Sequence, residues 1–168
     1  LDIGAGTTGI AIFQEGSIVY SASIPLGGNN ITSDIAIGLQ VSLEDAEKIK
    51  LNLGNLFDNK FEGEKVREVD SIPALLRRKE VTKPKKTKGE EIDLGVIGID
   101  KMVSKEKMEK IVEARCSEIL EMAKDNASKA GYEIAMPAGI VLTGGTALLR
   151  NITKFTQEMF GVAARIGT

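Results

Sequence analysis

The sequence predicts a mixed α/β domain, in which a mixed sheet carries flanking helices and a smaller α/β lobe is inserted. Short apolar segments stand near both ends of the chain, each beside a glycine-bearing turn, and segments with helical periodicity lie between them. The hydrophobic content of 42% and the charged content of 27% are ordinary for a globular protein. A chain of 168 residues can bury one core, or two small subdomains that share one.

The first predicted element is a β-hairpin. Residues 10–13 form a short apolar strand, residues 14–17 form a turn in which Gly16 can take a positive φ, and residues 17–24 return as a second strand. We therefore expect the sheet to begin with antiparallel strands.

Two helices are predicted after the hairpin. Three apolar residues at a spacing of four share one face of the first helix: Ile31, Ile35 and Leu39. Ser42 and Asp45 resemble a capping box, and the helix that they open is expected to cover residues 43–53 and to stop at Gly54.

Residues 55–103 carry weaker signals. Short strands are predicted at residues 66–69, 72–76 and 92–97, with a strongly basic loop at residues 77–88. No aromatic residue interleaves the charges of this loop, so a solvated loop is the simplest interpretation. Attraction of an acidic peptide, an anionic membrane or nucleic acid stays open.

The longest helix is predicted to begin after Ser104, a good N-cap residue, with Glu106 in its first turn and Gly131 beyond its end. Its apolar stripe consists of Met108, Ile111, Val112, Ile119, Leu120, Met122, Ala123 and Ala127. Cys116 lies midway along this helix, where we expect an inert core thiol rather than a nucleophile.

The last segment is predicted to form a strand, a turn, a helix and a strand. Residues 138–142 read as a buried strand, and a turn at residues 144–145 leads into a helix over residues 147–160. Residues 162–166 form the final strand of this prediction.

The glycine turn at the start of the chain has residue types suited to phosphate. Gly4 and Gly6 allow a tight bend with exposed N–H donors, and Thr7 and Thr8 add hydroxyl donors. Asp2 stands where a divalent cation could be held through water beside a phosphate. The alternative interpretation is an ordinary glycine-rich hairpin turn with a surface aspartate.

The second glycine turn contains Gly144, Gly145 and Thr146, between a predicted strand and a helix start. A helix N-terminus favours an anion or a polar sugar, and the missing side chains leave a flat slot for a purine. A turn that needs glycine only for close packing is the alternative. We expect the two turns to lie side by side on a common wall.

Composition excludes several classes of function. Without histidine, the chain cannot use imidazole catalysis, the usual zinc sites, or a Ser-His-Asp or Cys-His mechanism. A net charge of −2 and an aromatic content of 4% argue against a nucleic-acid partner. No apolar run reaches the length of a membrane span, and a single cysteine suits a reducing, cytoplasmic setting. The abrupt ends suggest a domain taken from a longer protein.

These motifs occur in an order that resembles the second large domain of the actin-like ATPase superfamily, which includes heat-shock chaperone ATPases and sugar kinases. Residues 2–8 look like its second phosphate loop, residues 26–28 like its glycine pair, and residues 143–146 like its adenosine loop. Glu47 and Lys50, three residues apart on one helix face, look like its nucleoside-contacting pair. The resemblance implies half of an actin-like, ribonuclease H-like ATPase fold.

Within the superfamily the chain is most similar to the FtsA family of cell-division proteins. The likeness lies in residues 7–13, 31–36, 46–50, 111–115, 139–145 and 162–167. It implies that residues 1–40 and 138–168 form subdomain 2A, and that residues 41–137 form the partner-binding subdomain 2B. It also implies ATP with Mg²⁺ as cofactor of the full-length protein, with Gly28 among the nucleotide-facing residues. The expected location is cytoplasmic, at the inner face of the cell membrane at the division site, through a C-terminal helix that is not in this chain.

The same resemblance implies a partner, the C-terminal peptide of the tubulin-like protein FtsZ. We expect Lys107, Lys110 and Arg115 to offer positive charge to this acidic peptide, and an ordinary exposed helix face is the alternative. Self-association into actin-like filaments stays open.

Two departures from the family pattern bear on activity. Ala5 replaces a glycine beside the phosphates, and Gly9 stands where family members carry an acid. We therefore expect at most a weak ATPase in the full-length protein and an inactive fragment. An actin-like pilus-assembly protein of the PilM type, half of a metabolite kinase and a structural module that has lost its nucleotide remain alternatives.

Overall fold

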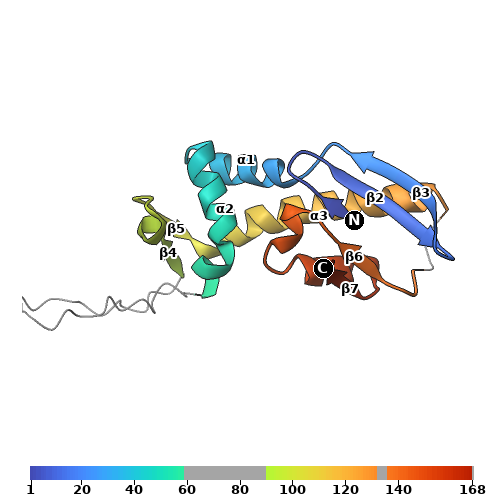
Figure 1. Cartoon of the computed structure of the whole chain (residues 1–168). Helices are drawn as coiled ribbons and strands as arrows, with labels where there is room; N and C mark the ends of the chain where they lie inside the picture. The colour runs from blue at the N-terminus through green and yellow to red at the C-terminus, as the bar shows by residue number, and fades with distance from the viewer. Residues whose placement is uncertain (59–89, 132–135, 168) are drawn as a thin grey trace, which may run out of the picture.

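The computed structural model describes residues 1–58, 90–131 and 136–167, and the predicted mixed α/β class is confirmed (Figure 1). The basic loop at residues 77–88 and the predicted strands at 66–69 and 72–76 lie outside the described residues. A long helix runs through the middle of the molecule, with the first hairpin at one end and a small β-hairpin at the other.

The first sheet is the predicted antiparallel hairpin with one short strand added. Strands β1 (Asp2–Ile3), β2 (Thr8–Gln14) and β3 (Ser17–Ile24) pair in that order. The turn between β2 and β3 has positive φ at Glu15 and Gly16, 51° and 81°, as two-residue hairpin turns require.

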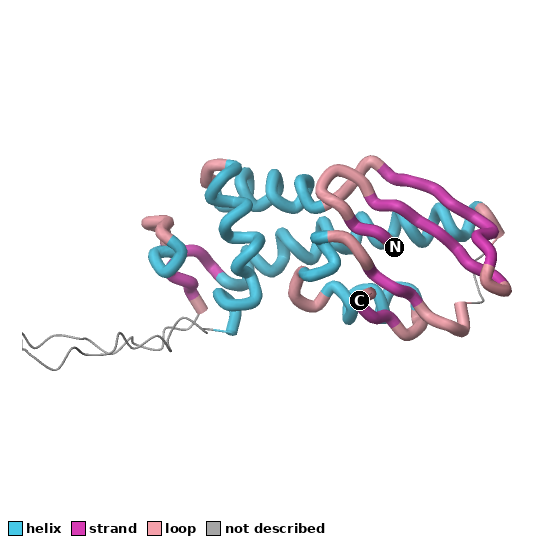
Figure 2. The backbone as a smooth tube through the Cα atoms, viewed as in Figure 1, coloured by secondary structure: helices cyan, strands magenta, loops and turns pink. Residues whose placement is uncertain are grey.

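The two ends of the chain meet beside β1 (Figure 2). Strands β6 (Ile140–Leu142) and β7 (Ala164–Ile166) are parallel partners, and Asp2 forms a parallel bridge with Thr143 just beyond β6. The amide of Ile3 donates to the Thr143 carbonyl at 2.8 Å, and the amide of Thr143 donates to the Leu1 carbonyl at 2.8 Å. The antiparallel pair of β1 with β2 and the parallel bridge of Asp2 with Thr143 therefore meet at β1. The sheet is mixed, as predicted.

Helices α1 (Gly28–Leu39) and α2 (Leu43–Asp58) follow the hairpin, and the predicted apolar face of α1 is buried. The Ser42 hydroxyl accepts from the Asp45 amide at 3.0 Å, which confirms the N-terminal cap of α2. The predicted stop at Gly54 is wrong, since the helix continues to Asp58. Leu53 and Leu56 are both buried, and their packing outweighs the cost of about 1 kcal/mol for glycine inside a helix.

A small β-hairpin, β4 (Glu91–Asp93) and β5 (Met102–Ser104), is joined through the 3₁₀ helix η3 (Leu94–Ile97). The predicted strand at residues 92–97 is therefore correct only at its start. The Asp93 carboxylate accepts from the Gly95 amide at 2.8 Å, which turns the backbone into η3.

Helix α3 (Lys105–Lys129) is the predicted long helix, with Ser104 as its N-cap and Gly131 at a φ of 84° beyond its end. It packs against α1 and against α4 (Ile152–Phe160), and it also contacts β2, β3 and β5. The buried residues of this helix are Met108, Val112, Cys116, Ile119, Leu120, Ala123 and Ala127. Ile111 and Met122 of the predicted stripe are partly buried against the same core.

The helix predicted over residues 147–160 is broken into the 3₁₀ helix η4 (Gly145–Leu148) and α4. Leu149 is extended and Asn151 has a φ of 64°, a left-handed conformation that asparagine tolerates. The break ends one helical segment and restarts the next with Ile152 and Thr156 facing the core. Across the described residues, no helix is both long enough and apolar enough to cross a bilayer.

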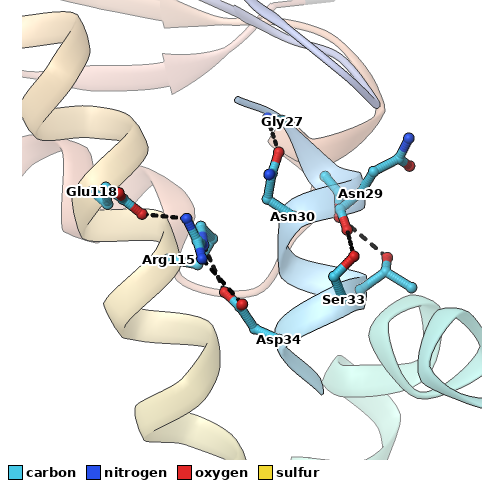
Figure 3. Close-up of polar contacts among 9 residues, drawn as sticks. Gly27, Asn29, Asn30, Ser33, Asp34, Arg115 and Glu118 are labelled. Atoms are coloured by element: carbon cyan, nitrogen blue, oxygen red, sulfur yellow. Dashed lines mark hydrogen bonds and ion pairs between the residues drawn. The ribbon is translucent and has the colours of Figure 1, made fainter. Parts of the chain in front are cut away.

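An ion pair connects α1 to α3 across the core. Arg115 Nε lies 2.6 Å from Asp34 Oδ2 and Arg115 Nη2 lies 3.0 Å from Asp34 Oδ1, a two-point contact (Figure 3). Arg115 also pairs with Glu118, one turn along α3. The side chains of Arg115 and Asp34 are 24% and 28% exposed, so water screens this pair less than a fully exposed one.

Asp34→Asn should lower the free energy of unfolding by about 1–2 kcal/mol, because a partly buried two-point ion pair is lost. Urea unfolding followed by circular dichroism measures this change. Lys110→Gln is the matched control, since its pair with Glu106 is largely exposed and should add nothing measurable. Equal stability of Asp34→Asn and the wild type would contradict the assigned role of the pair.

Cys116 should be inert in the native protein. Its side chain is 1% exposed, and burial raises the pKa of the thiol to about 12. At pH 8 we expect a disulfide reagent to modify the native thiol at least about 100-fold more slowly than the thiol in denaturant. Comparable rates in both conditions would show that the core around Cys116 is not closed.

Candidate functional site

Three glycine-bearing turns meet at one carbonyl oxygen. The Gly4 carbonyl accepts from the Gly28 amide at 2.9 Å and from the Thr146 hydroxyl at 3.0 Å. The turn at residues 4–7, the start of α1 and the start of η4 are therefore joined at this atom. The expectation that turns from opposite ends of the chain lie side by side is confirmed.

The turn at residues 4–7 presents amides to solvent. The Gly4 amide donates to the Thr7 carbonyl at 3.0 Å, which closes the turn, and Ala5, Gly6 and Thr7 are exposed. Within the described residues, no backbone carbonyl accepts from the amides of these three. Adjacent free amides on a tight turn form an anion-binding concavity.

Thr8 does not contribute to this concavity. Its side chain is fully buried, and its hydroxyl donates to the Leu26 carbonyl at 2.8 Å. The expectation that the Thr8 hydroxyl faces a phosphate is therefore wrong. The bond instead ties the start of β2 to Leu26, two residues beyond the end of β3, while the exposed Thr7 remains next to the free amides.

The second turn contacts the first through glycine. Gly144 has a φ of 85°, and a β-carbon there would stand 2.6 Å from Asp2 Oδ1. Only glycine satisfies both the conformation and the contact. The exposed carboxylate of Asp2 thus lies against the second turn, and the neighbouring Gly145 has open space where a side chain would stand.

Gly28 has a packing role that differs from the predicted one. Its amide donates to Gly4, and the next amide, of Asn29, donates to the Ala5 carbonyl at 2.7 Å, so neither is free for an anion. A β-carbon on Gly28 would stand 2.5 Å from Thr146 Oγ1 and 3.4 Å from Lys50 Nζ. Gly28 therefore allows α1, α2 and η4 to approach one another.

Glu47 and Lys50 share one face of α2, as predicted, and are joined by an ion pair of 2.7 Å. The Lys50 ammonium also donates to the Thr32 hydroxyl at 2.9 Å and to the Gly28 carbonyl at 3.2 Å. Thr32 in turn donates to Glu47 Oε2 at 2.5 Å. Sequence reasoning missed Thr32, because only the packing of α1 on α2 brings it to this pair.

The Glu47 carboxyl is ionised at neutral pH. Desolvation acts to raise its pKa, but hydrogen bonds from Lys50 and Thr32, together with the Lys50 charge, outweigh it and hold the pKa of Glu47 below its ordinary value. A carboxylate that is 42% exposed and ionised can accept hydrogen bonds from hydroxyl or amine groups of a ligand.

Arg115 does not offer a free charge. Its guanidinium is held by Asp34 and Glu118 (Figure 3), so the expectation that it faces an acidic peptide is corrected. Lys110 lies 2.6 Å from Glu106 on the same helix, an exposed pair that leaves it accessible. The three predicted partner-binding residues therefore have different surroundings.

Lys107 lines a groove of about 240 Å³ between the end of α1 and the start of α3. The other residues of the lining are Gly38, Leu39, Gln40, Lys101, Met102, Val103 and Ser104. The Lys101 ammonium donates to the Gln40 carbonyl at 3.1 Å, which spans the groove at one point. Sequence reasoning missed Lys101 and Met102, since the segment that leads into β5 carries no motif.

Comparison with known proteins identifies the family. The family model described as cell division protein FtsA matches residues 1–168. Cell division protein FtsA of Bacillus subtilis strain 168 is 33% identical over 168 residues, and that of Pseudomonas aeruginosa is 32% identical over 169 residues. These matches cover 100% and 99% of this chain but only 33% and 34% of the relatives, so the chain spans about a third of their length.

Solved structures show the same fold. MreB5 of Spiroplasma citri bound to AMPPNP matches with a TM-score of 0.60 and 25% identity, over 98% of this chain and 46% of that one. The ethanolamine utilization protein EutJ of Carboxydothermus hydrogenoformans matches with a TM-score of 0.61 and 18% identity, over 98% and 42%. The expected actin-like fold is thereby confirmed, and the chain belongs to the FtsA family of cell division proteins.

Proposed function

We propose that this chain is the nucleotide-facing half-domain of a bacterial cell-division adaptor of the FtsA type. Subdomain 2A, residues 1–40 and 138–168, would carry half of a nucleotide site, and subdomain 2B, residues 41–137, would bind the partner. The observation that carries the nucleotide proposal is the junction at the Gly4 carbonyl, which brings the free amides of the first turn beside the second turn.

In this proposal each element contacts a different part of ATP. The amides of Ala5, Gly6 and Thr7 hold phosphate oxygens, and the bare backbone at Gly145 accommodates the nucleoside. Glu47 accepts from a ribose hydroxyl, because its carboxylate is ionised and partly exposed. The MreB5 structures with bound AMPPNP and ADP support a nucleotide at this fold.

We propose that Mg²⁺ binds together with the phosphates. Asp2 is a single exposed carboxylate beside the anion-binding turn, and no cluster of three or more potential metal ligands exists among the described residues. One carboxylate suits a Mg²⁺ ion that keeps its waters and binds phosphate oxygens, so Asp2 would hold the ion through water. With Ala5 and Gly9 in place, we propose at most weak ATP hydrolysis in the full-length protein.

The proposed partner is the C-terminal peptide of FtsZ, bound mainly by subdomain 2B at the groove beside Lys107, to which residues 38–40 of subdomain 2A also contribute. The lining combines the positive charges of Lys101 and Lys107 with the apolar side chains of Leu39, Met102 and Val103. Met102 is 54% exposed, which offers contact area to an apolar side chain of an acidic peptide. Lys110 is exposed and lies three residues after Lys107 on the same helix, so it would add positive charge on this side of α3.

Membership of the FtsA family supports a proposal for the cellular setting. We propose self-association into actin-like filaments and action at the inner face of the cell membrane at the division site, with attachment through a helix outside residues 1–168. The complex of PilM with PilN, 15% identical to this chain at a TM-score of 0.59, shares the fold alone and does not favour pilus assembly.

Titration of the chain with ATP and Mg²⁺ should show weak, millimolar binding, because the opposite half of the cleft is missing. We expect amide chemical-shift changes in NMR spectra at residues 5–7, Glu47 and Gly145. Gly6→Val should weaken binding at least about tenfold without unfolding, since a β-carbon at this position has no protein atom within 4 Å and the added side chain stands among the proposed phosphate-binding amides. Ala11→Val, on the exposed face of β2, is the control. Micromolar affinity of the isolated chain would contradict the half-site.

Lys107→Glu should weaken binding of an FtsZ C-terminal peptide at least about tenfold, because charge reversal in the groove repels an acidic ligand. Lys110→Glu should have a smaller effect, since Lys110 does not line the groove. Fluorescence anisotropy with a labelled peptide measures both. By contrast, Arg115→Glu should lower the free energy of unfolding, because a glutamate beside Asp34 replaces attraction by repulsion. Peptide affinity that survives Lys107→Glu would remove the groove from the proposal.

A further inference from the structure

We infer that the edge of strand β3 binds a second copy of this chain, edge to edge and antiparallel, with Ser21 at the two-fold axis. The first sheets of the two copies then form one continuous sheet. A two-fold pair of this kind is closed, so it differs from the head-to-tail contacts that extend a filament. The inference rests on neither the proposed nucleotide site nor the proposed peptide groove.

Strand β3 is an open edge of the first sheet. The sheet has the order β1, β2, β3, and among the described residues only β2 forms backbone hydrogen bonds with β3 (Figure 1). In an antiparallel ladder, alternate residues direct their N–H and C=O groups away from the neighbouring strand. Strand β3 therefore directs a row of backbone donors and acceptors outward, which is the template that another strand binds.

The composition of β3 does not protect this edge. Exposed edge strands are ordinarily protected by charged side chains, by proline or by a short length. All eight residues of β3 (Ser17–Ile24) are uncharged, and none of them is proline. The irregular register opposite Ile12 and Phe13 lies towards the hairpin turn, whereas the register from Tyr20 to Ile24 is regular. A second strand can therefore pair along this regular part.

Side-chain size and charge favour a second copy as the occupant. Antiparallel pairing about Ser21 sets the large Tyr20 opposite the small Ala22. It also sets Val19, which is 40% exposed, opposite the compact Ser23. An identical strand brings identical charges together, and β3 has none, so no like-charge repulsion opposes the pairing. An uncharged edge also gives no preference for an acidic or a basic peptide.

The oligomeric state of this chain tests the inference. Sedimentation equilibrium should show reversible association to twice the mass of the chain. The association should need protein concentrations of about 0.1–1 mM, because a contact along a single strand is small and weak. A chain that stays monomeric at about 1 mM overturns the inference and leaves a peptide of another protein as the occupant of the edge.

Ser21→Lys should weaken the association at least about tenfold, since the two-fold axis brings the new charge opposite its own copy. Ser21 is exposed, so the change buries no charge within the chain. Ala11→Lys is the matched control: Ala11 is the β2 partner of Ser21 and is also exposed, but it lies one strand inside the edge. It should change the association by less than about threefold. A dimer that survives Ser21→Lys, or equal weakening by the two variants, overturns the inference.

A disulfide test does not depend on the folding of Ser21→Lys. In the proposed pair the two Ser21 α-carbons are about 4.5 or 5.5 Å apart, within the range that a disulfide spans. Mild oxidation of Ser21→Cys should therefore give a covalent dimer on a non-reducing gel, and native Cys116 does not compete because it is buried. Ala11→Cys, the matched control, should give at least about tenfold less dimer at the same concentration. No disulfide in Ser21→Cys, or equal yields from the two variants, overturns the inference.

Discussion

The carbonyl oxygen of Gly4 is the contact on which the candidate site depends. It receives one bond from α1 and one from the side chain of Thr146, residues that are 24 and 142 positions away. Glycine is required around it, since side chains at Gly28 or Gly144 would overlap with neighbouring atoms. The pairing of Asp2 with Thr143 supplies the register that brings these atoms together. A slip of one residue in that pairing would separate the two turns.

The two ends of α1 contribute to two different surfaces. Its first turn is bound to the residues that present the free amides, and its last residues, Gly38 and Leu39, line the groove beside Lys107. Between them, the pair of Asp34 with Arg115 holds the helix against α3. The arrangement explains why Arg115 is an internal contact although its charge suggested a partner. Because contacts hold α1 at its start, middle and end, the groove and the glycine turns keep fixed positions relative to each other.

Local patterns in the sequence were sufficient for most elements. The hairpin, the buried face of α1, the caps of α2 and α3 and the stripe of α3 follow from spacing and turn chemistry. The errors arose where tertiary packing decides: α2 continues through Gly54 because Leu53 and Leu56 are buried, and Asn151, with its left-handed backbone, divides the segment that was predicted as one helix. The sequence also predicted that the two glycine turns lie side by side and that Glu47 and Lys50 share one helix face, whereas contact of these residues with a nucleotide stays a prediction. It could not show that the donors of Thr8, Gly28 and Lys50 are already used, because their acceptors lie on other elements.

We propose that a nucleotide binds where the two glycine turns meet. The most direct measurement is NMR line broadening caused by Mn²⁺ bound to ADP, because a paramagnetic ion broadens the signals of nearby amides. We expect strong broadening at Ala5, Gly6, Thr7 and Gly145, and none at the groove residues Met102 and Val103. Broadening centred on the groove, or spread evenly over the surface, would contradict it.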